Sequence, residues 1–147
     1  MLKDIELVPI TIDDYQFGYE IKKITLKEYT EKTWGDWDEE EQIIFYKKEF
    51  KIDNCYIIKY NNINIGWLKI IETIKTIDIN QILILPEHQR KGIGSTIINY
   101  IIKNGRDKNK TICLQVLKCN ENAKRLYIKL GFKKYDETKT HFLLNIK

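Results

Sequence analysis

The sequence predicts one α/β domain, in which a mixed sheet is flanked by helices. In the first half of the chain, β-rich runs follow one another closely, which favours adjacent antiparallel strands. In the second half, strand-like runs alternate with segments of helical periodicity, which is typical of helical crossovers. The 147 residues and their 43% hydrophobic content suit one substantial core. We therefore expect residues 1–147 to form a single domain.

The N-terminal third predicts one strand and two helices. Residues 5–9 are an apolar run that ends at Pro9, because proline cannot donate to a sheet ladder. Residues 11–14 are of the types that begin helices, and a stripe of Tyr and Ile side chains follows them. Acidic residues at 36–41 mark the start of a second helix, since carboxylates stabilise a helix N-terminus. The apolar periodicity of this helix ends near Phe50.

Three β-rich runs occupy the middle of the chain. Residues 56–60 and 63–71 are separated by Asn61 and Asn62, which tolerate the left-handed backbone of a tight hairpin turn. Residues 74–85 first alternate in polarity and then become continuously apolar, as in a strand that is buried on both faces. We therefore predict a hairpin followed by the central strand of the sheet.

Two amphipathic helices alternate with strands in the second half. Residues 92–104 place five isoleucines on one helical face, and Gly105 is expected to stop that helix. Residues 111–117 predict a buried strand. Asn120 can cap a second helix that Gly131 would close. The chain then finishes in two strand-like runs, 132–135 and 141–146.

Composition argues against several classes of protein. The net charge of +4 is spread over scattered lysines and no recognition motif is present, so nucleic-acid binding is not expected. Cys55, Cys113 and Cys119 lack metal or disulfide spacing and predict reduced thiols, while His88 and His141 stand alone, so we expect no metal. No run of about eighteen apolar residues is present, and we expect a cytoplasmic protein without membrane insertion.

A glycine-bearing turn leads from the central strand into the helix that follows. The free N–H groups of a helix N-terminus, together with Gly92 and Gly94, can hold a phosphate or pyrophosphate. Arg90 and Lys91 add positive charge. Two familiar phosphate motifs do not fit, because Ile97 replaces the third glycine of a dinucleotide fingerprint and the Walker Gly-Lys-Ser/Thr is absent. A glycine-rich turn without a ligand is the alternative.

Two ordered motifs resemble the GNAT acyltransferase superfamily. The first is Gln89-x-x-Gly92-x-Gly94, between a buried strand and an amphipathic helix. The second, downstream, begins Asn120-x-x-Ala123-x-x-Leu126-Tyr127 and ends Lys129-Leu130-Gly131-Phe132. Together they span about a third of the chain, so the resemblance bears on cofactor binding more than on acceptor choice.

The resemblance implies acetyl-CoA as acyl donor and a set of binding residues. By position, the pantetheine arm would run beside the backbone of Ile82, Leu83 and Ile84 and would meet Asn120, and Tyr127 would face the sulfur. The pyrophosphate would be wrapped by Arg90, Lys91, Gly92, Ile93, Gly94 and Ser95. Without the motif, Asn120 would be read as a plain helix cap and Tyr127 as a core aromatic.

A thioester is already activated, so direct attack by an amine needs no enzyme nucleophile. Tyr127 is the candidate to protonate the departing thiolate, and a backbone N–H near Ile84, where the family commonly has a strand bulge, is the candidate oxyanion donor. Asp78 is the candidate base, with Glu72 or a water relay as alternatives. Gln115 stands where some family members carry a glutamate. Asp78 can also be read as a solvated polar position near a strand start.

The acceptor is the least determined part. Residues 34–41 combine Trp34 and Trp37 with acids, which suits a cationic amine. The alternative is that the acids stabilise a helix start while both rings pack inward. We expect an N-acetyltransferase for a small molecule, peptide or protein amine, as a monomer or homodimer. A noncatalytic acyl-CoA sensor is the competing class, and nucleic-acid binding ranks last.

Overall fold

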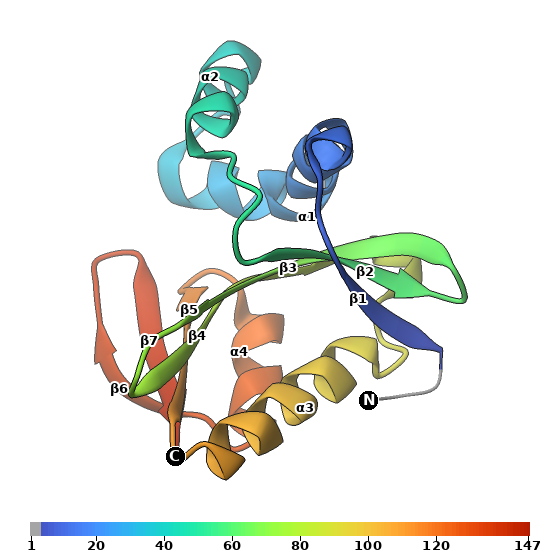
Figure 1. The fold of residues 1–147 in the computed structure, drawn as a ribbon. Helices are drawn as coiled ribbons and strands as arrows, with labels where there is room; N and C mark the ends of the chain where they lie inside the picture. The colour runs from blue at the N-terminus through green and yellow to red at the C-terminus, as the bar shows by residue number, and fades with distance from the viewer. Residues whose placement is uncertain (1–3) are drawn as a thin grey trace.

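A computed structural model describes residues 4–147 and shows a seven-stranded sheet with helices on both faces (Figure 1). The strands are β1 (Ile5–Pro9), β2 (Cys55–Tyr60), β3 (Ile63–Glu72), β4 (Thr76–Ile84), β5 (Thr111–Leu117), β6 (Lys133–Glu137) and β7 (His141–Ile146). The helices are α1 (Tyr15–Trp34), α2 (Glu39–Glu49), α3 (Ile93–Asp107) and α4 (Glu121–Lys129), with short 3-10 turns η1 (Ile12–Asp14) and η2 (Pro86–His88). The predicted α/β fold with a mixed sheet is confirmed.

The strand order is β1-β2-β3-β4-β5-β7-β6, so β4 is the central strand, as the sequence predicted. β4 and β5 pair in parallel through the α3 crossover, and the other neighbouring strands pair antiparallel. The predicted hairpin between β2 and β3 is also confirmed. Asn61 and Asn62 at its tip have φ values of 50° and 65°, the left-handed backbone that asparagine tolerates.

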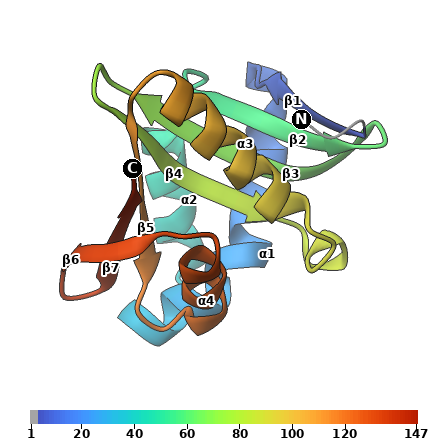
Figure 2. The ribbon, with the colours of Figure 1, turned by 90° about the horizontal axis from the view of Figure 1, so that it is seen from below.

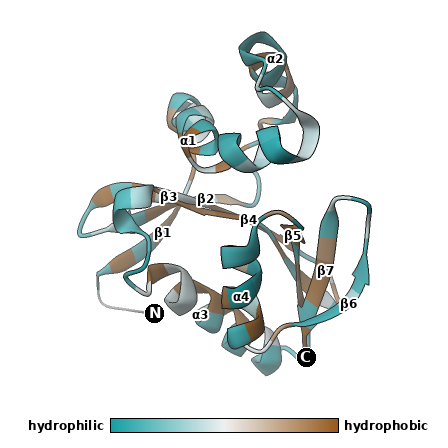
Figure 3. Ribbon diagram, turned by 180° about the vertical axis from the view of Figure 1, so that it is seen from behind, coloured by the Kyte–Doolittle hydropathy of each residue, from teal (hydrophilic) through white to brown (hydrophobic). Residues whose placement is uncertain are grey.

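Two apolar clusters lie on opposite faces of the sheet. The larger joins the isoleucines of α3 to β4, β5 and Phe132, and α4 packs against its edge. The smaller joins Ile21 of α1 to Trp67 and Leu83. Figure 3 shows hydrophobic residues along the strands and hydrophilic residues along much of α2 and α4. Both sides of the central sheet are therefore excluded from water by helices.

Gly105 does not stop helix α3, and this expectation from the sequence was wrong. The helix continues to Asp107, and Asn109 takes the left-handed φ of 56° just beyond its end. A Cβ built on Gly105 would lie 2.5 Å from Cδ1 of Ile112. The glycine is therefore explained by close approach between α3 and β5 instead of by helix termination.

A bulge in β4 changes which residues face each side of the sheet. Lys69 of β3 pairs with Gln81 and the next residue pairs with Ile79, so Asn80 is the extra residue. Before the bulge Ile79 faces α3, and after it Ile84 does, while Leu83 faces α1. The family resemblance had suggested a bulge near Ile84, and the structure places it four residues earlier, at Asn80.

Candidate active site

The parallel pairing of β4 and β5 stops halfway along both strands. Their register runs from Thr76 opposite Thr111 to Ile79 opposite Leu114, yet β4 continues to Ile84. Figure 2 shows the two strands diverging beyond that point. Residues 81–84 still pair with β3 on their other side, so one edge of their backbone lacks a strand partner. An extended ligand with amide groups can bond to such an edge as a strand would. We call this opening the β4–β5 seam.

The predicted phosphate-binding turn closes one end of the seam. The side-chain Nε2 of Gln89 donates to the backbone oxygen of Ile84 at 2.8 Å, which fixes the turn to the end of β4. Arg90 and Gly92 both adopt left-handed backbone, with φ of 62° and 80°. Among residues 4–147, apart from the two chain neighbours of Gly92, no atom lies within 4 Å of a Cβ built on this glycine, so a ligand can approach its backbone.

Helix α3 begins without a side-chain cap. Asp38 caps α2 and Asn120 caps α4, each by accepting from a backbone N–H in the first turn. Within the described residues, α3 has no such acceptor. The first-turn N–H groups of α3 and its dipole are therefore available to an anion. The side chains of Arg90 and Lys91 are exposed beside this turn, whereas the side chain of Ile93 is buried in the core and leaves only its backbone to bind.

Asn120 lies across the seam, at the start of α4. Its Oδ1 accepts from the N–H of Ala123 at 3.2 Å, so Asn120 does cap the helix. That bond uses the amide oxygen and leaves both amide N–H donors for another partner, because no other bond of this side chain is found in residues 4–147.

Tyr127 points from α4 into the larger apolar cluster. Its ring meets that of Phe132 edge-on, with centroids 6.2 Å apart. Burial raises the pKa of Tyr127 to about 12, so its hydroxyl stays protonated at neutral pH. No hydrogen bond from this hydroxyl is found within the described part of the chain. The side chain is a core aromatic whose proton remains available to a ligand.

Asp78 faces the opposite side of the sheet from Tyr127. It lies opposite Cys113 of β5, one residue before the seam opens, and Asn80 donates to its Oδ2 at 3.4 Å. Burial raises the pKa of Asp78, and the Asn80 bond lowers it by a smaller amount. A half-buried carboxylate with a raised pKa is a better base near neutral pH than an exposed one.

The alternatives to Asp78 are placed less favourably. Glu72 lies at the far end of β3, where hydrogen bonds from Lys108 and Lys110 lower its pKa. Such a carboxylate holds a proton less readily than an ordinary glutamate. Gln115 is exposed on β5, beyond the end of the paired region, and cannot act as a base.

Sequence reasoning missed two side chains that the fold brings beside Asp78. Burial raises the pKa of Cys113, and the nearby charge of Asp78 adds to this rise. The pKa of Tyr135 on β6 is raised by burial, with smaller contributions from Cys113, Asp136 and Asp78. No local pattern could have grouped these residues, because their proximity depends on the register of β4, β5, β7 and β6.

The acidic segment 34–41 combines parts of both sequence interpretations. Asp38 accepts from the N–H of Glu41 at 3.0 Å, so an acid does stabilise the start of α2. Trp34, however, is 62% exposed and does not pack inward; its ring lies 6.3 Å from that of His141. Trp37 is partly buried, and its Nε1 donates to Glu39 at 2.9 Å. This segment therefore contacts the start of β7 from above the sheet.

The two histidines are separated in the fold. His88 packs edge-on against Tyr60, and its Nδ1 is buried without a hydrogen-bond partner in the described structure. His141 begins β7, where burial lowers its pKa. Among residues 4–147 no group of three or more His, Cys, Asp or Glu side chains could hold a metal ion, and none of the described helices is long and apolar enough to cross a membrane.

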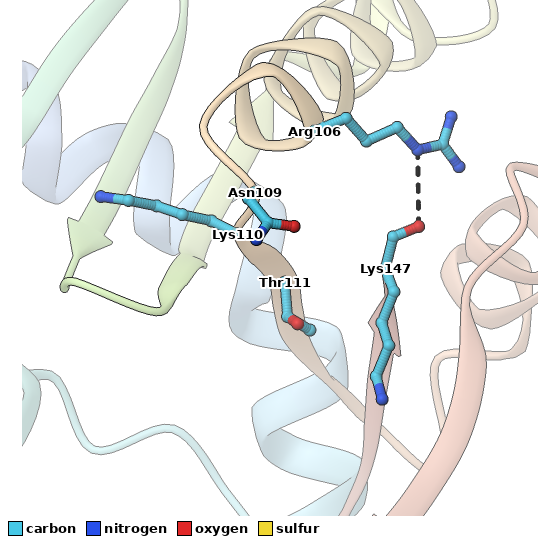
Figure 4. Close-up of a pocket in the computed structure, with 5 residues that line it drawn as sticks. All are labelled: Arg106, Asn109, Lys110, Thr111 and Lys147. Carbon is cyan, nitrogen blue, oxygen red and sulfur yellow. Dashed lines mark hydrogen bonds between the residues drawn. The ribbon is translucent and has the colours of Figure 1, made fainter.

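A separate basic cavity of about 180 Å³ lies at the C-terminal end of α3. Figure 4 shows its lining residues, Arg106, Asn109, Lys110, Thr111 and Lys147. The Nε of Arg106 donates to the backbone oxygen of Lys147 at 3.4 Å. This cavity is at the opposite end of α3 from the glycine turn, so it is distinct from the seam.

Sequence comparison identifies the family. Residues 19–132 match the family described as the acetyltransferase (GNAT) family. The N-acetyltransferase CgeE of Bacillus subtilis, itself described as uncharacterized, is 31% identical over 90 residues, which are 60% of this chain and 35% of that protein. The match therefore spans about a third of the length of that relative.

Solved structures share the fold. The PaiA N-acetyltransferase of Thermoplasma acidophilum, in complex with coenzyme A, has a TM-score of 0.76 at 20% identity and covers 97% of this chain and 98% of its own. Spermidine N-acetyltransferase of Vibrio cholerae, in complex with CoA and spermine, has a TM-score of 0.68 at 21% identity and covers 99% and 96%. With a family match over well more than half of its length and this shared fold, the chain belongs to the acetyltransferase (GNAT) family.

Proposed function

We propose that this acetyltransferase moves the acetyl group of acetyl-CoA to a primary amine of a small molecule or peptide, by direct attack on the thioester. The observation that carries the proposal is the β4–β5 seam, which has an unpaired strand edge along its side and an uncapped helix N-terminus at its end. A pantetheine arm needs amide partners and a pyrophosphate needs N–H donors and positive charge. The relatives in complex with CoA support this donor.

The donor's contacts follow from the shape of the seam. The backbone of Ile82, Leu83 and Ile84 would bond the pantetheine amides from one side, and the free amide N–H donors of Asn120 would do so from the other. The turn from Arg90 to Ser95 would hold the pyrophosphate. Only the backbone of Ile93 can take part, since its side chain is buried.

Asp78 and Tyr127 lie on opposite sides of the sheet, which suits a reaction that passes through the seam. We assign Asp78 to remove the proton of the attacking amine on the α1 side. The new C–N bond forms as a backbone N–H of β4 near Ile84 stabilises the oxyanion. The C–S bond then breaks, and the thiolate departs on the α4 side, where Tyr127 lies.

The raised pKa of Tyr127 limits what its hydroxyl can do. A thiol has a pKa of about 8.5, so complete proton transfer from a group at about 12 is uphill by roughly 5 kcal/mol. Donation of a hydrogen bond to the developing thiolate carries no such penalty. We therefore assign Tyr127 to stabilise the departing sulfur by a hydrogen bond. The proton that Asp78 takes from the amine can reach the CoA thiolate through solvent.

The distribution of charge favours a cationic acceptor. On the α4 side, Lys118, Lys124 and Lys134 surround the ring of Phe142, with Nζ atoms 5.4, 4.1 and 5.2 Å from its centroid. The α1 side carries Asp78 of β4 and, further away, the seven carboxylates of residues 28–41. An amine is attracted to this acidic side, and the spermine seen with the Vibrio cholerae enzyme is an amine.

A noncatalytic acyl-CoA sensor is the second candidate. Gln115 favours it, because the family resemblance implies that some members carry a glutamate at this position, and glutamine cannot act as a base. Mass spectrometry separates the two. The protein is mixed with acetyl-CoA and a panel of polyamines, amino acids, aminoglycosides and peptides, and free CoA and acetylated product are measured together. Stoichiometric product establishes transfer. Binding of acetyl-CoA without any product supports the sensor, and absence of binding rejects both.

The one-domain organisation over residues 1–147, the cytoplasmic location and the monomeric or homodimeric state remain predictions of the sequence. Size-exclusion chromatography with light scattering decides the last of these.

A further inference from the structure

A cavity of about 210 Å³ lies between α1 and α2. Its walls are three tyrosine rings, one carboxylate, one amide and one aliphatic side chain: Tyr15, Tyr19, Tyr46, Glu39, Gln16 and Ile43. The cavity is on the α2 side of α1, whereas Ile21 of the same helix packs against the sheet in the cluster with Leu83. It is therefore separate from the seam and from Asp78, and nothing in the transfer reaction uses it.

The tyrosine rings are arranged as the wall of a cation site. The ring of Tyr46 lies 4.8 Å from that of Tyr15 and 5.4 Å from that of Tyr19, in tilted and edge-on geometries. Aromatic faces attract cations, most strongly where water is excluded. One cationic side chain already lies on this aromatic group: Nζ of Lys22 is 4.7 Å from the centroid of the buried Tyr46 ring, although burial lowers the pKa of this lysine to about 8.

Glu39 places an anion at the rim of the same cavity. Its Oε1 accepts from the hydroxyl of Tyr19 at 3.0 Å, and its Oε2 contacts Nε1 of Trp37 and Nζ of Lys23, both at 2.9 Å. The bond from Lys23 is the largest cause of a lowered pKa for Glu39, so this carboxylate is ionised at neutral pH. Oε1 retains a lone pair, and an exposed ion pair such as that with Lys23 is weak enough for a ligand to share or displace.

The surrounding charge has the same sign. Residues 15–49, which form both helices, hold nine carboxylates and six lysines, a net charge of −3 in a chain whose net charge is +4. A positively charged ligand is therefore concentrated at this end of the molecule and an anion is repelled from it.

We propose that the cavity between α1 and α2 is a binding site for a small organic cation, an alkylammonium or quaternary ammonium ion. The cationic group lies against the faces of Tyr15 and Tyr19 beside Glu39, and Ile43 contacts the alkyl part. Because the site spans both helices, its ligand holds α2 against α1. The proposal does not depend on transfer of an acetyl group.

Binding of choline to the protein without acetyl-CoA tests this site, at constant ionic strength maintained with sodium chloride. Calorimetry gives the affinity, and backbone amide NMR shifts locate the ligand. The comparison ligand is dimethylbutanol, in which carbon replaces the quaternary nitrogen. We expect choline to bind about tenfold more tightly than dimethylbutanol and to shift the amides of α1 and α2 around Tyr15, Tyr19 and Glu39.

Three variants sharpen the test. Glu39→Gln and Tyr15→Leu each weaken choline binding by about fivefold, whereas Glu40→Gln, the same charge change on a neighbouring exposed side chain, leaves it unchanged. Circular dichroism of each variant confirms that the fold is retained. Equal affinity for choline and dimethylbutanol, equal effects of Glu39→Gln and Glu40→Gln, or shifts centred on Asp78 and Cys113 would each overturn the proposal.

Discussion

Helices α3 and α2 lie on opposite sides of the sheet and bury very different amounts of apolar surface. All five isoleucines of the α3 stripe are buried, namely Ile93, Ile97, Ile98, Ile101 and Ile102. Helix α2 buries only Tyr46 and leaves Ile44 and Phe45 mostly exposed. The helix beside the proposed donor site is therefore held by continuous apolar packing, whereas α2, on the side of the proposed acceptor, is held by few apolar contacts.

The largest expected difference between these two sides is in stability. Ile98→Ala removes a side chain that is 1% exposed and should lower the free energy of unfolding by about 2 to 5 kcal/mol, through lost burial and a cavity. Ile44→Ala, on a side chain that is 67% exposed, should change it by less than about 0.5 kcal/mol. Urea unfolding of both variants measures the contrast. Similar losses in the two variants would show that α2 is packed as firmly as α3.

Tyr127→Phe tests the donor side of the proposed chemistry. Loss of the hydroxyl should lower kcat by about 100-fold, because the departing thiolate loses its hydrogen-bond donor. The Kd of acetyl-CoA should stay unchanged. Tyr100→Phe is the matched control, since Tyr100 is 45% exposed on α3, and it should keep full activity. Turnover equal to the parent's, where chemistry limits the rate, would remove Tyr127 from the mechanism.

Asp78→Asn tests the proposed base, and it is expected to change activity and stability in opposite directions. Burial raises the pKa of Asp78, so the folded state disfavours its ionised form. That cost is absent below the ordinary carboxyl pKa and grows as the pH rises through the raised value. The variant should therefore have a higher Tm than the parent at pH 8 and a similar Tm at pH 4, while it loses the ascending limb of the pH–rate profile.

Exposed Asp36→Asn is the control for Asp78→Asn and should change neither the activity profile nor the Tm difference between the two pH values. An unchanged pH–rate profile in Asp78→Asn would leave Glu72 or a water relay as the base.

The smallest expected effect separates two roles of Asn120. Asn120→Ala removes the cap of α4 and should cost about 1 kcal/mol of stability. Asn120→Asp keeps a capping oxygen and should restore that stability, but it has no amide N–H and should not restore acetyl-CoA affinity. Calorimetric titration and thermal unfolding of both variants measure the two quantities. If Asn120→Asp binds acetyl-CoA as the parent does, Asn120 is a helix cap alone.

The sequence predicted the elements of the fold well where the signal is local. The isoleucine stripe of α3, the Asn61-Asn62 turn and the cap at Asn120 depend on neighbouring residues only, and each was found where expected. The role of Gly105 was misread because its reason is the Ile112 side chain, which belongs to another element. Closeness between elements cannot be read from periodicity.

In the candidate site too, features set by neighbouring residues were predicted and features set by contacts between distant strands were not. The turn from Arg90 to Ser95 and the position of Tyr127 are carried by short motifs, so the sequence was sufficient to propose them. The bulge at Asn80, the place where β4 and β5 part, and the grouping of Cys113 and Tyr135 with Asp78 depend on strand register. Register between distant strands is set by packing of the whole sheet, and the sequence alone does not show it.

Hydrogen exchange with and without acetyl-CoA tests the central claim, that the donor binds in the β4–β5 seam. The amides of residues 82–84 and 92–95 should gain protection on binding, whereas those of residues 77–79, already within the paired part of β4, should not change. Protection centred on the basic cavity at Arg106 and Lys147, or no change in the seam at saturating acetyl-CoA, would contradict the account.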